Sequence, residues 1–216
     1  MSTFRNLNHL IYASAFGIIL FSCNNSPNDS VAEANKENSE NMNRPADQKN
    51  VDSAAAAVMP TKADADFLVN AASGGMLEVE LGRMAQTHAR NPRVKDFGAM
   101  MIKDHTQSGN KLKALASSKN IALPDSVSNS QGREKERLQK LKGSAFDQAY
   151  IDMMVDDHKN DIDEFNDHAS NGTNPAIKSF AADQLKTLHV HLDSAVNIQK
   201  QVSQKKTTDH DILPVH

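Results

Sequence analysis

Two Asn-Pro dipeptides, Asn91-Pro92 and Asn174-Pro175, most constrain how this chain can fold. Asparagine is a favoured helix N-cap and proline is favoured in the first helical turn, so each dipeptide predicts a tight junction where a new helix begins. Apolar residues recur at helical spacing on both sides of each junction. The four predicted helices run from the capping sequence Thr61-Lys-Ala-Asp64 to about His88, from Asn91-Pro92 to about Ser118, from the capping sequence Ser144-Ala-Phe-Asp147 to about Ser170, and from Asn174-Pro175 to about Val202.

A long connection separates the second predicted helix from the third. Leu123-Pro124 ends the second helical segment, and a short helix is predicted from Arg133 to Leu141. Two antiparallel helix hairpins joined by one long crossover have the connectivity of ferritin-like bundles. The sequence therefore predicts an all-α, ferritin-like four-helix bundle over residues 63–203, with the short helix in its crossover.

Composition agrees with helices and narrows the classes of partner. The 216-residue chain has no tryptophan and 5% aromatic residues, so its core must consist of aliphatic, methionine and alanine side chains, which suit helices better than a β-sandwich. A formal net charge of -3 provides no field that would attract nucleic acid, and we expect no nucleic-acid partner. A single cysteine excludes an intrachain disulfide.

The first 23 residues have the features of an export signal. Leu10 to Phe21 is an apolar run that is too short to span a bilayer but fits the core of a signal peptide. It ends in Leu20-Phe21-Ser22-Cys23, which resembles a bacterial lipobox, although Phe21 departs from the small residue most common there. We expect Cys23 to be lipidated and to anchor the mature chain in the cell envelope, facing the periplasm, with the outer membrane as the expected location. The alternative is an uncleaved membrane anchor with a chance cysteine.

The segments that flank the predicted bundle are polar. Residues 24–62 contain almost no large apolar side chains, and such a segment cannot bury enough surface to offset the entropy lost on ordering. We therefore expect a disordered tether over residues 24–62 and a disordered tail over residues 204–216.

One motif occurs twice. It reads aromatic, two other residues, Met-Met, aliphatic, any residue, Asp-His, and it ends at His105 and, in altered form, at His158. On helical wheels at about 100° per residue, both histidines lie within an apolar stripe, while the adjacent Asp104 and Asp157 lie at its edge. Each of the four helices places at least one titratable group within its stripe. The inward set is Glu78, His105, His158, Asp161 and His191.

Counting from the junctions indicates how deep these groups lie. Glu78 and His105 are 13 and 14 residues from the first Asn-Pro junction, and His158 and His191 are 16 and 17 residues from the second. The two hairpins differ by three residues, or about 4.5 Å at a helical rise. If the hairpins pack with their turns side by side, all four groups could converge on one point.

A buried set of carboxyl and imidazole groups has two interpretations. Imidazole suits a transition metal such as iron or copper, and a bound metal would offset the cost of burying these groups. The Glu-x-x-His motif of di-iron bundles does not occur in the sequence, which argues against a standard ferroxidase, and no reaction is predicted. In the alternative, Glu78 and Asp161 hold the histidines by hydrogen bonds in a metal-free structural, stress or interaction module.

Two methionines permit a variant of the metal interpretation. Met101 and Met154 each lie four residues before a histidine of the set, so each pair shares a helix face. Thioether sulfur together with imidazole suits Cu(I). The alternative is that both methionines fill gaps in the core.

Several of these motifs resemble the bacterial family called domain of unknown function 4142, a ferritin-like group of exported proteins. The resemblance implies a four-helix ferritin-like fold and a location in the cell envelope. It implies no established activity and indicates no protein partner. It covers about residues 62–200 and rests on Gly75-Met-Leu-Glu78 with Glu80-Leu-Gly82, Met100-Met-Ile-Lys-Asp-His105, Ala145-Phe-Asp-Gln-Ala-Tyr150, the later His158, and Leu188-His-Val-His191.

Overall fold

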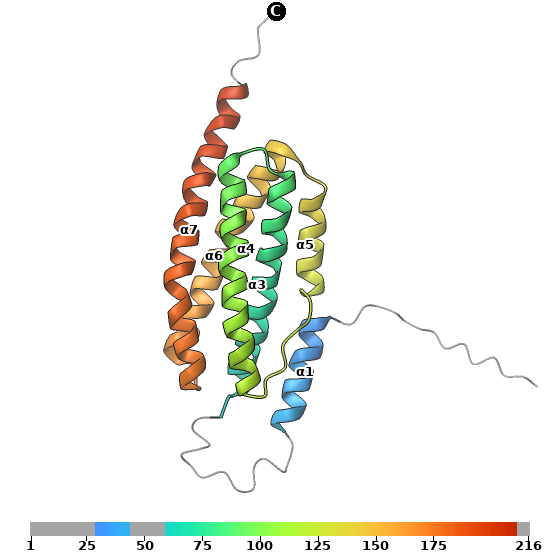
Figure 1. Ribbon diagram of the computed structural model, residues 1–216, viewed down its shortest axis with the longest axis vertical. Helices are drawn as coiled ribbons and strands as arrows, with labels where there is room; N and C mark the ends of the chain where they lie inside the picture. The colour runs from blue at the N-terminus through green and yellow to red at the C-terminus, as the bar shows by residue number, and fades with distance from the viewer. Residues whose placement is uncertain (1–28, 44–58, 211–216) are drawn as a thin grey trace, which may run out of the picture.

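The computed structural model describes residues 29–43 and 59–210, and within these ranges the chain forms six α-helices and no β-strand (Figure 1). The all-α class predicted from the sequence is confirmed. None of the helices in these ranges combines the length and the apolar character needed to cross a membrane. The predicted signal peptide, its Cys23 and residues 211–216 lie outside the described residues. The helices are α1 (Ser30–Met42), α3 (Lys62–His88), α4 (Pro92–Ser118), α5 (Asn129–Gln139), α6 (Gly143–Asn171) and α7 (Pro175–His210).

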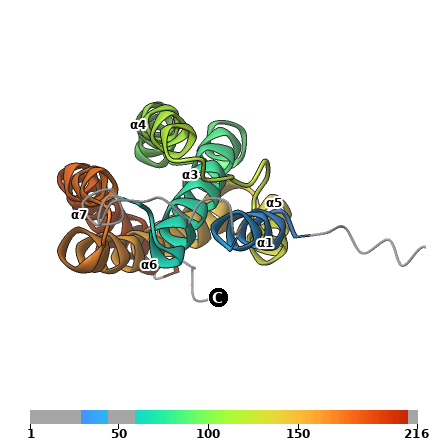
Figure 2. The same cartoon turned by 90° about the horizontal axis from the view of Figure 1, so that it is seen from below.

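Helices α3, α4, α6 and α7 run alongside one another as a helical bundle, in which α3 packs most extensively on α4 and α6 on α7 (Figures 1 and 2). Helix α5 lies against α3 and α6, and α1 packs on the same side of α3. Apolar side chains fill the bundle in two clusters. One lies toward the α3–α4 junction and includes Phe97, Met101 and Tyr150; the other lies toward the α6–α7 junction and includes Leu68 and Ile177.

Local sequence signals begin three of the four bundle helices where predicted. Thr61 and Asp64 form a capping box at the start of α3, in which each residue accepts a hydrogen bond from the backbone N–H of the other. The side chain of Asn91 accepts a hydrogen bond from the backbone N–H of Arg93 in α4. The side chain of Asn174 accepts hydrogen bonds from the first turn of α7 in the same way.

Each junction is also held by an aspartate from the other hairpin. Asp147 on α6 accepts hydrogen bonds at 3.0 and 2.9 Å from the backbone N–H groups of the last two residues of the α3–α4 junction. Asp64 on α3 accepts hydrogen bonds at 3.2 and 3.4 Å from the last two residues of the α6–α7 junction. Asp147 and Asn174 follow Asp64 and Asn91 by the same 83 residues, so the two hairpins share one plan.

Replacement of Asp64 is expected to destabilise the fold in a pH-dependent way. Burial raises the pKa of Asp64, but hydrogen bonds from Thr61, Asn174 and Thr173 outweigh burial and lower the pKa below its usual 3.8. A carboxyl group with a lowered folded-state pKa contributes stability above its unfolded-state pKa, and this contribution is lost as the pH falls through the folded-state value. We expect Asp64→Asn to cost about 1–3 kcal/mol at pH 7.

Urea unfolding at pH 7 and pH 3 measures this effect. The difference in free energy of unfolding between wild type and Asp64→Asn should be smaller at pH 3, where protonation of Asp64 begins to remove the advantage of the wild type. A difference of equal size at both pH values would contradict the assignment of an ionised Asp64 in the folded chain.

Helix α1 corrects the prediction of a disordered tether over residues 24–62, because residues 30–42 are helical. Asp29 caps this helix and accepts a hydrogen bond at 2.9 Å from the backbone N–H of Asn129 in the crossover. Asn38 is buried and makes two hydrogen bonds, at 2.7 and 2.9 Å, to the backbone of Ala122. Hydrogen bonds between polar side chains of this segment and the backbone of the crossover thus hold α1 in place. A segment with few large apolar residues can be ordered in this way.

The starts of α5 and α6 also differ from the predicted ones. Helix α5 begins four residues before Arg133, because Ser128 and Gln131 form a capping box. Helix α6 begins at Gly143, whose φ of 60° is readily adopted by glycine, and no side chain caps it. The predicted cap at Ser144 is therefore wrong, and the aspartate of that predicted box holds the α3–α4 junction instead.

Helix α7 continues to His210, past the predicted end at Val202. Residues 204–210 of the predicted disordered tail are thus helical. Near the predicted end, α7 makes two hydrogen bonds to α6. Gln199 donates to Asp152 at 2.7 Å, and Ser203 donates to Gln148 at 3.4 Å.

Candidate metal centre

A layer of polar side chains crosses the bundle between the two apolar clusters. Glu78 comes from α3, His105 from α4, His158 from α6 and His191 from α7. Apolar residues lie about one turn away on the same face of each helix, so the periodicity that builds the core also turns these groups inward. Three of the side chains are buried, and only 10% of the His105 side chain is exposed.

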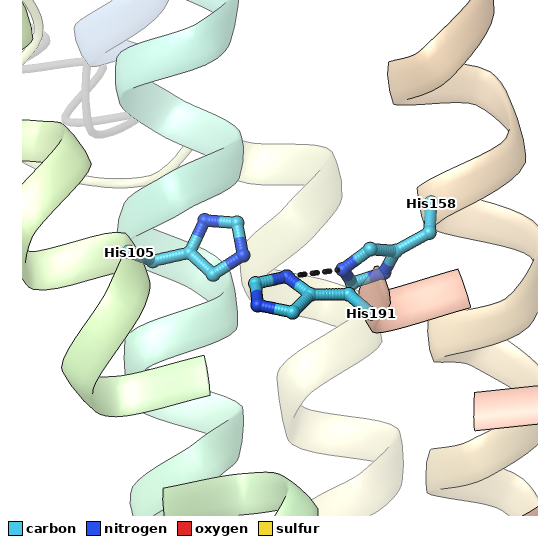
Figure 3. Close-up of side chains that lie close together, drawn as sticks. All are labelled: His105, His158 and His191. Atoms are coloured by element: carbon cyan, nitrogen blue, oxygen red, sulfur yellow. Dashed lines mark hydrogen bonds between the residues drawn. The ribbon is translucent and has the colours of Figure 1, made fainter. Parts of the chain in front are cut away.

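The three imidazole rings lie close together at the centre of this layer (Figure 3). The ring centroid of His105 is 5.9 Å from that of His158 and 5.3 Å from that of His191. One nitrogen from each ring lies within 4.8 Å of those from the other two. Within the described ranges, this is the only group of three or more histidine, cysteine or acidic side chains placed to hold a metal ion.

Each ring also has an acceptor on its outer side. Glu78 places Oε2 at 2.8 Å from Nδ1 of His105 and Oε1 at 3.5 Å from Nδ1 of His158. The same Nδ1 of His158 donates at 2.9 Å to the backbone carbonyl one turn earlier on α6. Oδ2 of Asp104 lies 3.1 Å from Nε2 of His191. Because carbonyl and carboxylate oxygens only accept, these contacts place a proton on each outer nitrogen.

The inner nitrogens are then Nε2 of His105, Nε2 of His158 and Nδ1 of His191. Nε2 of His105 has no hydrogen-bond partner among the described residues. Nε2 of His158 and Nδ1 of His191 lie 3.2 Å apart with a lone pair on each. Moving the His191 proton to Nδ1 would satisfy that contact, but its Nε2 lone pair would then face the carboxylate of Asp104. While the rings are neutral, hydrogen bonds alone leave one repulsive contact in this layer.

Burial keeps two of the three rings neutral at pH 7. Loss of solvent lowers the pKa of His158, and the neighbouring His105 lowers it further. Burial also lowers the pKa of His191 to about 4. His105 differs, because the charge and the hydrogen bond of Glu78 outweigh burial and raise its pKa. Burial raises the pKa of Glu78, but the charge and the hydrogen bond of His105 outweigh burial and lower this pKa below its usual value.

A cavity of about 60 Å³ lies beside the rings, with walls from all four bundle helices. This volume has room for a few water molecules. His105 and His191 line the cavity, and so does Asp161. The carboxylate of Asp161 forms no hydrogen bond or ion pair with any residue that the structure describes. Burial, and then the charge of Glu78, raises the pKa of Asp161 well above its usual 3.8.

The structure brings together four of the five residues of the predicted inward set. Asp161 is the exception, because it lines the cavity but makes no hydrogen bond or ion pair with a histidine of the layer. Asp104 is a member of the site that the helical wheel placed only at the edge of the apolar stripe. The signal that could have found it is its position beside His105, from which a carboxylate can reach the neighbouring helix and His191.

The two methionines of the repeated motif lie in the apolar core. Met101 and Met154 are fully buried in the cluster near the α3–α4 junction. Met154 contributes its backbone carbonyl to the histidine layer. These positions favour the interpretation that both side chains fill space in the core.

Fold and site together define a helical-bundle protein with a buried tri-histidine cluster. The chain belongs to the family Domain of unknown function (DUF4142), whose model matches residues 47–198. The resemblance indicated by the sequence motifs is confirmed at the level of this family. No curated protein and no solved structure matches the chain.

Proposed function

We propose that this chain binds a transition-metal ion through His105, His158 and His191, within a ferritin-like four-helix bundle. The observation that carries the proposal is the set of polar contacts made by the three rings, from which their proton pattern follows. Every outer nitrogen faces a fixed acceptor, while two inner nitrogens lie 3.2 Å apart without a proton to share and the third has no partner within the described part of the chain. Metal-binding histidines almost always donate the remote N–H to a carboxylate or a backbone carbonyl, which is the arrangement of this layer.

The spacing of the inner nitrogens supports the same proposal. Two nitrogens bound at about 2.0–2.1 Å to one tetrahedral ion lie about 3.3 Å apart. The 3.2 Å between His158 and His191 is close to this value, and a cation there would convert a repulsive contact into an attractive one. The third nitrogen, within 4.8 Å, has to move inward, and the cavity beside His105 gives this ring room to do so. Three protein ligands leave a fourth position for water or another small ligand.

The ligand set indicates which ions fit and what the site does. Neutral imidazole nitrogens suit zinc, copper, iron and nickel. Asp104 and Glu78 orient the rings from outside and strengthen them as ligands. Without the Glu-x-x-His motif of di-iron oxidases, the function best supported is binding and holding of a metal ion.

Elemental analysis of the full chain, purified without a histidine tag, tests this function. We expect about one transition-metal ion per chain. The double variant His105→Ala/His158→Ala should lose the ion, because it lacks two of the three ligands. His189→Ala is the matched control, since His189 is exposed on α7 two residues before His191. A wild-type chain without stoichiometric metal, whose unfolding does not respond to a chelator, would contradict the proposal and favour the metal-free module.

We further propose that lipid attached to Cys23 holds the protein in the bacterial cell envelope. The support is the sequence Leu20-Phe21-Ser22-Cys23 at the end of a short apolar run. Mass spectrometry of the mature chain should find Cys23 as its first residue with a lipid mass attached. Cys23→Ser should retain residues 1–22. A wild-type chain that still begins at Met1 would favour the uncleaved anchor.

A further inference from the structure

A groove beneath α5 leads to the cavity beside the histidines. The groove has a volume of about 800 Å³ and is lined by residues of α3, α5 and α6. Gly74, Glu78 and Asp161 line both the groove and the cavity. These three residues therefore form the boundary between the groove and the tri-histidine cluster.

Acidic side chains dominate the titratable lining of the α5 groove. This lining consists of five carboxyl groups and one guanidinium group. Burial raises the pKa of Asp157 to about 7 and the pKa of Asp161 well above its usual 3.8, so these two do not carry full negative charges at pH 7. The guanidinium of Arg137 is paired with Glu134. The ammonium of Lys159 lies 3.6 Å from the carboxylate of Asp156. The acidic groups of the groove still outnumber these two cations. The five carboxyl groups belong to Glu78, Glu134, Asp156, Asp157 and Asp161.

Two other grooves approach the same cavity but suit a cation less well. The groove between α3 and α4 has a volume of about 260 Å³ and carries Arg83 and Lys113 against one carboxylate. The groove between α4 and α7 has a volume of about 230 Å³ and carries Lys111 against two carboxylates. Of these three grooves, the α5 groove thus has the largest volume and the largest excess of acidic over basic side chains.

One buried atom of the boundary and one buried atom beside it have no hydrogen-bond partner among the described residues. The side chain of Glu78 is 3% exposed, and its Oε1 makes no hydrogen bond although the residue lines both spaces. Nε2 of His105, on the wall of the cavity, also has none. The wall is open at Gly74, where an added Cβ would meet no atom within 4 Å. A carboxylate oxygen and a neutral imidazole nitrogen are both electron-pair donors that suit a cation.

We propose that the α5 groove is the route by which a divalent metal cation reaches the tri-histidine cluster, passing Asp157 and Asp161 and crossing at Gly74. This inference rests on the proposed function. Carboxylates that line a cleft raise the local concentration of cations and their association rates by about 10–10³-fold, and this effect falls as ionic strength rises. A passage sets how fast the ion arrives and leaves, but it does not change the affinity of the occupied site.

Stopped-flow mixing of the full chain with Co²⁺, followed by its absorption, tests the route. Gly74→Leu should slow association and chelator-driven release by the same factor and leave Kd unchanged, because it narrows the passage without touching a ligand. Gly109→Leu is the matched control. Gly109 also lines the cavity and has open space at its Cβ, but it lies on the groove between α3 and α4. This variant should load at the wild-type rate.

A second variant tests the charges independently. At pH 8, Asp157→Asn/Asp161→Asn should slow Co²⁺ association about 10-fold at low ionic strength and weaken its salt dependence. Unchanged rates in Gly74→Leu, or slowing by Gly109→Leu instead, would overturn the route. If Gly74→Leu does not fold by circular dichroism, the aspartate variant decides, and a wild-type rate and salt dependence there would overturn the route. A wild-type chain that binds no Co²⁺ would overturn the proposed function as well, whereas binding with unaltered rates overturns the route alone.

Discussion

Replacing Glu78 with alanine is expected to lower the free energy of unfolding of the metal-free chain by about 3–5 kcal/mol. Glu78 is the buried acceptor for His105 at 2.8 Å and lies 3.5 Å from His158. Removing one partner of a buried pair leaves the other without compensation, which costs more than the pair itself contributes. Metal affinity should also fall by about 10–100-fold, because the outer partner no longer orients a ligand. Urea unfolding and a Co²⁺ titration measure the two effects.

Glu80→Ala is the matched control for this experiment. Glu80 lies two residues away on α3 and pairs with Lys135 at 2.7 Å, but both side chains are about a third exposed. An exposed ion pair contributes about 0–1 kcal/mol, so we expect little change in stability and none in metal affinity. If Glu78→Ala were as mild as Glu80→Ala in both measurements, Glu78 would not have the role assigned to it.

Replacing Gly82 with valine is expected to destabilise the chain by about 3 kcal/mol or more, at the upper end of what overpacking costs. A Cβ on Gly82 would lie 2.6 Å from the backbone carbonyl oxygen of Gly98 on α4. Backbone cannot rotate aside as a side chain can, so α3 and α4 would have to separate. Glu78, one turn away on α3, would then lose its 2.8 Å contact with His105, and metal binding should weaken with stability.

Thermal and urea unfolding of Gly82→Val measure this effect against a glycine on the same helix. Gly74→Ala is the control, because its added Cβ would meet no atom within 4 Å. Alanine is favoured over glycine within a helix by up to about 1 kcal/mol, so this variant should be slightly more stable than wild type. A Gly82→Val chain as stable as Gly74→Ala would contradict the close packing of α3 on α4.

The bundle helices could be predicted because the signals that begin and end them are local. Thr61 caps α3 from the position just before its first residue. Asn91 and Asn174 cap α4 and α7 from the same position. Helix α1 could not be predicted, since its order depends on contacts such as that of Asn38 with Ala122, 84 residues away. The cap expected at Ser144 failed for a related reason, because the aspartate near it is used by the other hairpin.

The candidate site could be predicted in outline but not in its connections. Helical periodicity and distance from the junctions indicated that Glu78 and the three histidines lie inward at similar depth. Periodicity describes where a side chain leaves its helix and not how far it reaches. For this reason the wheel missed Asp104, which reaches His191 on α7. The wheel also could not show that Asp161 would line the cavity without a hydrogen bond or ion pair to a histidine of the layer.

The exchange of aspartates between the hairpins has a consequence for how the chain folds. Neither hairpin can complete its own turn, because the carboxylate that accepts the N–H groups of each junction belongs to the other half. These contacts join residues 56 and 110 positions apart, so they form only after both halves have met. In an intermediate with one formed hairpin, the N–H groups of its junction would bond to water in place of the aspartate. We therefore expect the two halves to stabilise each other, so that the order of the four helices that carry the polar layer depends on both hairpins.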